Sequence, residues 1–455
     1  MIRELLSLDD KGFYKKITAI AIPIALQNLI NFGVSMMDTL MVGKMGEIPL
    51  SAAAAANNVS FLFFLFTFGI ANGCGVLTAQ YWGADDKKSV ISTIAFMYRI
   101  VMVVAVIFAV VGIFFPAFVL RLFIPDEAVI AEGVKYLRII SVGFFFGAIT
   151  NSSIGILRSV GTVKISVYVY STSLVVNTFL NYCLIFGKFG FPAMGIEGAA
   201  IATVIARAVE AGVILVFLFK FDKKLEMRPR DLLYVEKEIV DKAIHYSMPV
   251  VLNEFIWGMG SMVISSVIGH LGREALSANS ICSVLFQLAQ AAMFGLSSAA
   301  SAVTGQTVGS GNYAGARRQA KTFVLLSFIM GLFGTCVMLI TRYPLINFYR
   351  GSMSPVVIEY AFSMSLMAAV LVVAQTVSMI TMMGILRGGG DTKFVMMGDV
   401  MFMWVFAIPV GIFGGFILKL PVHWVYFLLK SDDILKAFLA LFRLSGGKWL
   451  KDITR

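Results

Sequence analysis

The 455-residue sequence contains little charge, since Asp, Glu, Lys and Arg make up 14% of it while 59% of the residues are hydrophobic. A water-soluble chain of this length could not cover so much apolar surface with so few polar residues. Only three histidines occur, and they form no HExxH metal motif. No GxxxxGK[ST] motif is present, so the chain does not itself hydrolyse ATP. We therefore expect neither a soluble protein nor an enzyme.

Cysteine is also scarce, and the four residues lie singly in apolar segments without CxxC pairing, at positions 74, 183, 282 and 336. They are best interpreted as small core side chains, and no cofactor is predicted. The net charge of +11 does not indicate nucleic-acid binding, because Lys and Arg concentrate in the termini and in alternate loops. That asymmetry is the positive-inside rule. We expect a multi-pass protein of the cell inner membrane with both termini in the cytoplasm.

Apolar segments of about 20 residues or more recur along the chain, each long enough to cross the hydrocarbon core as a helix. A polar stretch at 220–242 separates them into two groups and is predicted to be a cytoplasmic linker. The domains are then 1–219, with helices 1–6, and 243–455, with helices 7–12 and a cytoplasmic tail. The predicted spans are 17–43, 48–81, 89–117, 130–155, 164–187, 196–219, 243–269, 275–308, 320–345, 356–385, 394–418 and 421–443.

The two groups are repeats of one another. Shifting residues 23–83 by 226 positions places them on 249–309 with 16 identities in 61 gapless positions. Further on, the sequence GILR at 155–158 recurs at 384–387. Six spans is an even number, so both halves enter the membrane from the same side. The predicted fold is an all-α membrane protein of twelve transmembrane helices, in two parallel six-helix repeats (N- and C-lobes) around a central cavity.

Three segments carry a family resemblance: DTLMVG at 38–43, the stretch from Asn177 to Thr203, and GILRGGGDTK at 384–393. Together with the spacing of Pro23 to Asp38, they resemble the multidrug and toxic compound extrusion (MATE) family over essentially the full chain. The NorM-like bacterial branch is the most similar, because the fifth-helix position that is Asp in archaeal-type members is Asn181 here. The resemblance implies a twelve-helix exporter driven by Na⁺ or H⁺.

Asp38 lies among apolar residues in the first span, where an ionised carboxylate costs several kcal/mol unless it is paired or faces water. Asn177 and Asn181 are four residues apart on one face of the fifth helix. The resemblance implies that these three residues, with Thr203, form an N-lobe cation site. Their oxygens suit Na⁺, and a proton on Asp38 is equally reasonable. Alternatively, Asp38 is a hydrated helix-end acid and the asparagines only bond neighbouring helices.

Glu254 lies in the seventh span, and its counterpart in the first half is Asn28. The cost of an intramembrane carboxylate favours a functional interpretation, as a possible second acidic site that attracts cationic substrate or takes a proton. The family often pairs this acid with an Asp on the tenth helix. Here that helix has no carboxylate beyond Glu359 at its start, so a paired second cation site is not expected.

Two further sets of residues are predicted from spacing and chemistry. Two i, i+3 pairs, one in the last span of each half, are predicted to be structural ion pairs: Arg207 with Glu210 and Lys430 with Asp433. Flexible or aromatic side chains suit the binding of flat hydrophobic cations. The candidates for the cavity lining are Met36, Met37 and Trp257.

These residues, together with what the family resemblance implies, predict a secondary antiporter that exports organic cations in exchange for Na⁺ or H⁺ by alternating access. Its expected partners are membrane lipid and cationic amphipathic small molecules, and we expect it to function as a monomer. The alternative is a flippase for lipid-linked oligosaccharide, which related superfamilies perform. A flippase predicts unpaired basic residues in the cavity, whereas the spans are expected to offer mainly acids.

Overall fold

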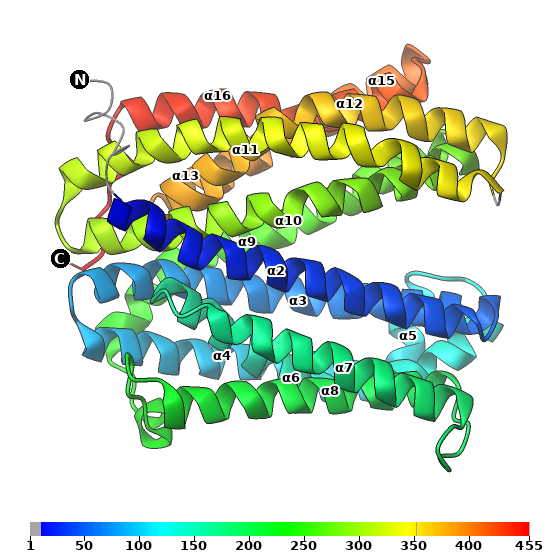
Figure 1. The fold of residues 1–455 in the computed structure, drawn as a ribbon, viewed down its shortest axis with the longest axis horizontal. Helices are drawn as coiled ribbons and strands as arrows, with labels where there is room; N and C mark the ends of the chain where they lie inside the picture. Colours follow the sequence, from blue (N-terminus) through cyan, green and yellow to red (C-terminus); the bar gives the residue numbers. More distant parts are fainter. Residues whose placement is uncertain (1–10, 352, 455) are drawn as a thin grey trace.

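The computed structural model describes residues 11–351 and 353–454, and within these ranges the chain is helical, with no strand. In the first half, long apolar helices follow one another through short turns (Figure 1). They are α2 (Lys11–Gly43), α3 (Glu47–Gly83), α4 (Lys87–Phe114), the short α5 (Pro116–Arg121), α6 (Glu127–Ser159), α7 (Lys164–Phe186) and α8 (Ile196–Val216), which η1 (Phe217–Phe221) extends.

The second half repeats this arrangement after a connecting segment that contains η2 (Pro229–Leu233). Several of its helices include π-helical turns. The elements are α9 (Lys237–His270), α10 (Arg273–Gly309), α11 (Tyr313–Phe348), η3 (Tyr349–Gly351), α12 (Pro355–Met379) with η4 (Ile380–Leu386), α13 (Thr392–Val400) with η5 (Met401–Ala407), α14 (Ile408–Ile412) with η6 (Phe413–Ile417), α15 (Val422–Leu429) and α16 (Asp432–Ser445).

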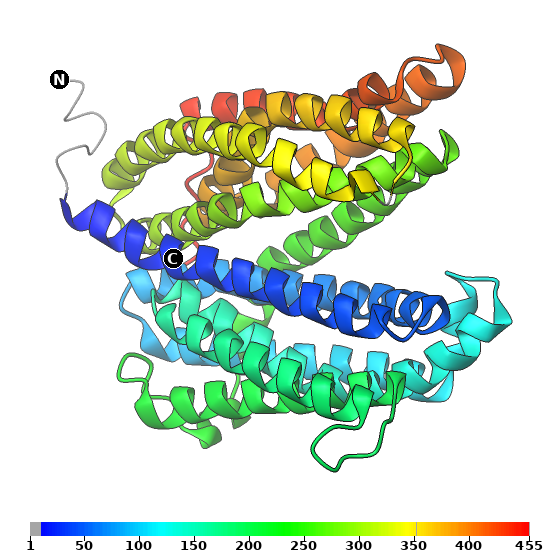
Figure 2. The ribbon, with the colours of Figure 1, turned by 45° about the vertical axis from the view of Figure 1, so that its right-hand side comes forward.

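The helices form two bundles that correspond to the two halves of the sequence (Figure 1). Figure 2 shows the bundles meeting at the end that carries the C-terminus and separating toward the opposite end. Helix α2 of the first bundle packs against α10 of the second, and α3 packs against α9. The first two long helices of each bundle therefore form the contact between the bundles. The all-α, two-lobe architecture predicted from the sequence is confirmed.

Among the described residues, eleven helices are long and apolar enough to cross a membrane. The predicted span 421–443 is instead two helices, α15 and α16, because the chain turns at Lys430 and Ser431. This break removes the helical spacing on which the predicted ion pair with Asp433 depended. The Nζ atom of Lys430 lies 5.4 Å from the ring centre of Phe286, and no salt bridge joins it to Asp433 in the described chain. That predicted pair is wrong.

Helix ends also differ from the prediction at two arginines. Helix α6 continues to Ser159, four residues beyond the predicted limit at 155, and so includes Arg158. Arg387 follows η4 without interruption of the helix. Both side chains are buried rather than placed in loops. The predicted spans ended too early because arginine lowers the average hydropathy of a segment. A helix can nevertheless include a charged side chain that is buried inside the protein.

The two lobes touch backbone to backbone where α3 and α10 end. A Cβ atom added to Gly83 would lie 2.0 Å from the carbonyl oxygen of Gln306. A Cβ atom added to Gly309 would lie 1.9 Å from the carbonyl oxygen of Gln80. Only glycine permits so close an approach. Because these two contacts are equivalent under the sequence repeat, the lobes close this end of the molecule symmetrically.

Hydrogen bonds from two repeat-related glutamines cross between the lobes at the same end. The side chain of Gln80 bonds to backbone groups of the second half: the carbonyl oxygens of Gly388 (3.2 Å) and Lys451 (3.1 Å) and the amide of Ile453 (2.9 Å). The Nε2 atom of Gln306 donates to the carbonyl oxygen of Ser159, 2.6 Å away. We call this set of bonds the glutamine contact. It ties each lobe to the other at the closed end.

Candidate functional site

The four residues predicted to form the N-lobe site lie together, on three different helices. The Nδ2 atom of Asn181 in α7 donates to Oδ1 of Asp38 in α2 (2.5 Å) and to Oδ1 of Asn177 (3.1 Å). Asn177 in turn donates through Nδ2 to Oγ1 of Thr203 in α8, 3.4 Å away. The spacing of the asparagines by one helical turn places their amides on one face, which permits this chain of bonds.

One oxygen in this cluster has no partner. The Oδ1 atom of Asn181 is buried and accepts no hydrogen bond from any described residue. A buried amide oxygen left unpaired costs free energy unless something else satisfies it. Together with the carboxylate of Asp38, it offers hard oxygen ligands of the kind that Na⁺ prefers. The repeat places Ile264, a buried apolar residue, at the position equivalent to Asp38, so this chemistry exists in one lobe only.

Three residues of the cluster, Asp38, Asn177 and Thr203, line a cavity of about 200 Å³ inside the N-lobe. Its wall also contains the salt bridge between Arg207 and Glu210, whose charged atoms are 2.9 Å apart, as predicted from their spacing. This places the pair beside Asp38 rather than at a remote structural position. The positive charge of Arg207 therefore belongs to the electrostatic environment of the carboxylate, although Glu210 largely neutralises it.

In the C-lobe, Glu254 is buried on α9 and forms a salt bridge with Arg387, with Oε1 and Nη1 2.8 Å apart. The sequence predicted the importance of the acid but not this partner. Because the guanidinium neutralises the carboxylate, the pair in this conformation carries no net charge with which to hold a second cation.

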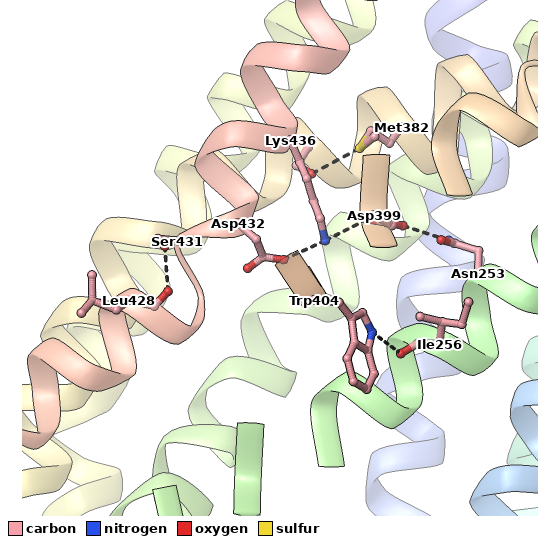
Figure 3. A network of polar contacts seen from close by, with 10 residues as sticks. Asn253, Ile256, Met382, Asp399, Trp404, Leu428, Ser431, Asp432 and Lys436 are labelled. Atoms are coloured by element: carbon pink, nitrogen blue, oxygen red, sulfur yellow. Dashed lines mark hydrogen bonds and ion pairs between the residues drawn. The ribbon is translucent and has the colours of Figure 1, made fainter. Parts of the chain in front are cut away.

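A second buried network in the C-lobe was not predicted at all (Figure 3). The Nζ atom of Lys436 in α16 lies between two carboxylates, 2.8 Å from Asp399 of α13 and 2.7 Å from Asp432. The other oxygen of Asp399 accepts a hydrogen bond from Asn253 of α9 at 2.8 Å. The signal was available, since Asp399 and Lys436 both interrupt predicted spans, and charges within spans normally find partners.

Between the lobes lies a central cavity of about 600 Å³, which is within the range of cavities that hold drug-sized ligands. Both lobes contribute aromatic, polar and charged residues to its wall. It shares part of that wall with the N-lobe cavity, so the two spaces are adjacent. The shared residues are Asn31, Ser35, Phe64, Asn151 and Tyr170.

Comparison with known proteins decides the family. The family model described as MatE matches residues 23–183 and 249–413, one match in each half, and together these cover well over half of the chain. The chain belongs to the MatE family. It is thus a membrane transporter and not an enzyme, as the sequence resemblance implied.

Relatives of this MatE transporter extend over most of its length. It is 26% identical over 444 residues to the "Probable multidrug resistance protein NorM" of Thermotoga maritima, covering 96% of this chain and 93% of that protein. It is 27% identical over 336 residues to the "Probable multidrug resistance protein YoeA" of Bacillus subtilis, covering 72% and 71%. A crystal structure of a MATE protein in complex with MaL6 has the same fold, with a TM-score of 0.87 at 18% identity, covering 95% and 97%.

Of the three residues predicted to line the cavity of this MatE transporter, one lies in its wall. Trp257 lines the central cavity. Met36 and Met37 do not, and Met36 is 52% exposed. The rotation of α2 explains the error: Ser35 faces the cavity, and each following residue turns about 100° around the helix axis. Sequence composition identified the residue type but not the direction of the side chains.

The cavity wall contains the expected acids, but also basic side chains that the sequence did not predict there. Two basic side chains, Arg158 and Lys436, line the central cavity of the MatE transporter beside the acids Glu254, Asp399 and Asp433. Arg158 was missed because α6 extends beyond its predicted end, and Lys436 because the charges of the last span were interpreted as the pair Lys430 with Asp433. The cavity wall therefore presents both signs of charge.

Replacing Lys436 should destabilise this MatE transporter. We expect Lys436→Met to lower its stability by about 3–5 kcal/mol, because Asp399 and Asp432 would be left as buried carboxylates without a countercharge. A fluorescence thermal-shift assay in detergent should show a lower unfolding midpoint, and Asp399→Asn added to Lys436→Met should restore part of it. The control is Lys448→Met, at an exposed position. An unchanged midpoint for Lys436→Met would contradict the assigned pairing.

Proposed function

We propose that this MatE protein is a secondary antiporter that exports amphipathic organic cations in exchange for Na⁺ or H⁺. The observation that carries the proposal is the chain of hydrogen bonds from Thr203 through Asn177 and Asn181 to Asp38, beside a cavity that adjoins the central cavity. The names of the Thermotoga and Bacillus relatives, which both state multidrug resistance, support the choice of drugs as substrates.

The coupling ion binds in the N-lobe. Either Na⁺ lies among the oxygens of Asp38, Asn181 and neighbouring groups, or a proton binds to the carboxylate itself. In both cases one positive charge neutralises Asp38. Moving one charge through 100 mV supplies about 2.3 kcal/mol, which corresponds to roughly fiftyfold accumulation of substrate.

Ion and substrate affect each other through the wall that their cavities share. Asn31, Ser35 and Tyr170 border both spaces, so a change in the position of α2 on ion binding alters the shape of the substrate cavity. The glutamine contact closes one end of the molecule, which we assign to the cytoplasmic side from the Lys and Arg distribution. Alternating access then requires this contact to break while the opposite end closes.

The topology and assembly follow from the same features. Both termini lie in the cytoplasm and the protein resides in the inner membrane, because the basic residues concentrate on that side of the predicted spans. The central cavity is built from the two lobes of one chain, so a monomer suffices for transport.

The proposal is tested by ethidium efflux from proteoliposomes under an imposed Na⁺ gradient and, separately, an imposed pH gradient. We expect one of the two gradients to drive efflux above the rate in protein-free liposomes. If neither gradient drives efflux of ethidium or of any other cationic dye, the antiport proposal is wrong.

The flippase alternative gains one supporting observation, namely that basic side chains line the central cavity. It predicts translocation of a lipid-linked pyrophosphate in liposomes without any ion gradient. Reconstituted protein that moves such a lipid but no cationic dye would favour the flippase over the antiporter.

A further inference from the structure

A small cavity of about 50 Å³ lies between the lobes beside the central cavity, with which it shares Phe68, Asn72, Arg158, Phe294 and Met383. Its size suits a small charged group rather than a whole drug molecule. Two buried guanidinium groups, those of Arg158 and Arg387, contribute to its wall. Half of the remaining wall consists of phenylalanine and serine side chains, and the rest is mostly alanine and glycine.

The wall of this small cavity is built from repeat-related residues, one from each lobe. Three equivalent pairs face it: Arg158 with Arg387, Phe68 with Phe294, and Asn72 with Ser298. Such pairing places the cavity on the axis that relates the two halves. An occupant would therefore contact both lobes at once.

The two arginines differ in their partners. Arg387 is neutralised by Glu254 at 2.8 Å. The position equivalent to Glu254 in the first half is Asn28, so the repeat supplies no acid for Arg158. Within residues 11–351 and 353–454, no side chain forms a salt bridge with Arg158, and its buried Nε has no hydrogen-bond partner.

Arg158 is only 9% exposed, and its guanidinium carbon lies 5.7 Å from the ring centre of Phe294. A cation–π contact offsets a small part of the cost of burying an unpaired charge. A carboxylate or phosphate group would offset far more, because guanidinium binds both through paired charge-assisted hydrogen bonds. The Nε and Nη2 atoms of Arg387 are also buried without hydrogen-bond partners, so the second guanidinium retains donors for the same ligand.

From this geometry we infer that the small cavity is an anion-binding site, in which Arg158 receives the carboxylate or phosphate of an amphipathic ligand whose apolar body lies in the central cavity. Phe68, Phe294 and Met383 line both spaces and would contact that body. The ligands are then zwitterions and amphipathic anions as well as simple cations. The inference rests on the proposed function in that the central cavity carries amphipathic substrates.

A matched pair of fluorescent probes tests the site: rhodamine B, which carries a free carboxylate, and its ethyl ester, which does not. Binding to detergent-solubilised protein is followed by fluorescence anisotropy without any ion gradient. We expect Arg158→Gln to weaken the binding of rhodamine B at least tenfold, since hydrogen bonds to a charged group are lost, and to change the binding of the ester less than twofold. Arg158→Lys should retain part of the affinity.

The control is Arg138→Gln, at an exposed position of the same helix, which should change neither affinity. Equal losses for acid and ester in Arg158→Gln would show that Arg158 only supports the cavity wall, and would overturn the inference. So would unchanged binding of rhodamine B.

A second measurement separates this inference from the proposed function. Dodecyl phosphate should raise the unfolding midpoint of the wild-type protein but not that of Arg158→Gln, even if neither rhodamine binds or is exported. Phosphatidylglycerol is then added in place of dodecyl phosphate. The same Arg158-dependent shift would identify a lipid headgroup as the source of the anion, and its absence would identify a soluble amphiphile. If dodecyl phosphate stabilises both proteins equally, or neither, the anion site does not exist.

Discussion

Asp38→Asn is expected to abolish ion-driven efflux while leaving the fold intact. The substitution keeps the size of the side chain and an oxygen that can accept the hydrogen bond from Asn181, but it removes the negative charge. Without that charge, the site can neither bind Na⁺ nor take up a proton, so an ion gradient can no longer drive transport. In proteoliposomes, the rate of gradient-driven ethidium efflux should fall to the rate of protein-free liposomes.

The matched control is Glu359→Gln, which removes an equivalent charge from the exposed start of α12 and should leave efflux unchanged. Thermal-shift midpoints of the two variants should lie close to that of the wild type, since Asp38 forms no salt bridge among the described residues. Coupled efflux that persists in Asp38→Asn would remove this carboxylate from the mechanism.

Removal of the glutamine contact should open the closed end of the transporter. The double substitution Gln80→Ala with Gln306→Ala eliminates four hydrogen bonds between the lobes, each contributing about 1 kcal/mol. A loss of about 4 kcal/mol shifts the equilibrium away from the closed conformation by roughly a thousandfold. Electron-spin distance measurements between labels at Ala84 and Ser310, both exposed at this end, should show a longer distance in the variant.

The label experiment requires replacement of Cys336 alone, because the other three cysteines are buried. A suitable control is Gln319→Ala, which removes a hydrogen bond from Thr307 within one lobe. That variant should retain the wild-type distance. If the Gln80 and Gln306 double variant also retains it, the backbone contacts at Gly83 and Gly309 are sufficient to hold this end closed, and the glutamines are not the determinant.

These two predictions address different steps of one cycle. Asp38 lies in the N-lobe cavity and is proposed to sense the ion, whereas the glutamine contact joins the lobes at the closed end. The central cavity lies between the lobes, and its wall includes the charged residues Glu254, Asp399, Asp433 and Lys436 of the C-lobe. A variant defective in ion coupling should therefore still change conformation, and a variant with an open glutamine contact should still bind the ion.

The N-lobe site shows most clearly how much could be predicted from the sequence. Asp38, Asn177, Asn181 and Thr203 were chosen from intramembrane polarity, helical spacing and the family resemblance, and the structure joins all four by hydrogen bonds. The Arg207–Glu210 pair followed from spacing on one helix in the same way. The two pairs on a single helix succeed because residues one turn apart on a continuous helix must share a face, whereas the grouping across three helices came from the family resemblance.

The predictions that failed depended on how helices end or rotate. The predicted pairing of Lys430 with Asp433 assumed a continuous helix, but α15 ends at Leu429 and α16 begins at Asp432, and no salt bridge joins the two residues in the described chain. Met36 and Met37 have suitable side chains, yet α2 turns them away from the central cavity. A sequence pattern specifies which residues share a helical face but not which neighbour that face meets.

By itself, then, the sequence determined eleven of the membrane-spanning helices and the two parallel lobes, whereas the grouping of Asp38 with residues of two other helices came from the family resemblance. It could do so because apolar length, repeat symmetry and helical spacing are local properties of the chain. Only the tertiary structure decided that Lys436 lies between Asp399 and Asp432, that Glu254 is neutralised by Arg387, and that Arg158 has no acidic partner. These features arise from contacts between helices distant in sequence, and the packing of whole bundles sets such contacts.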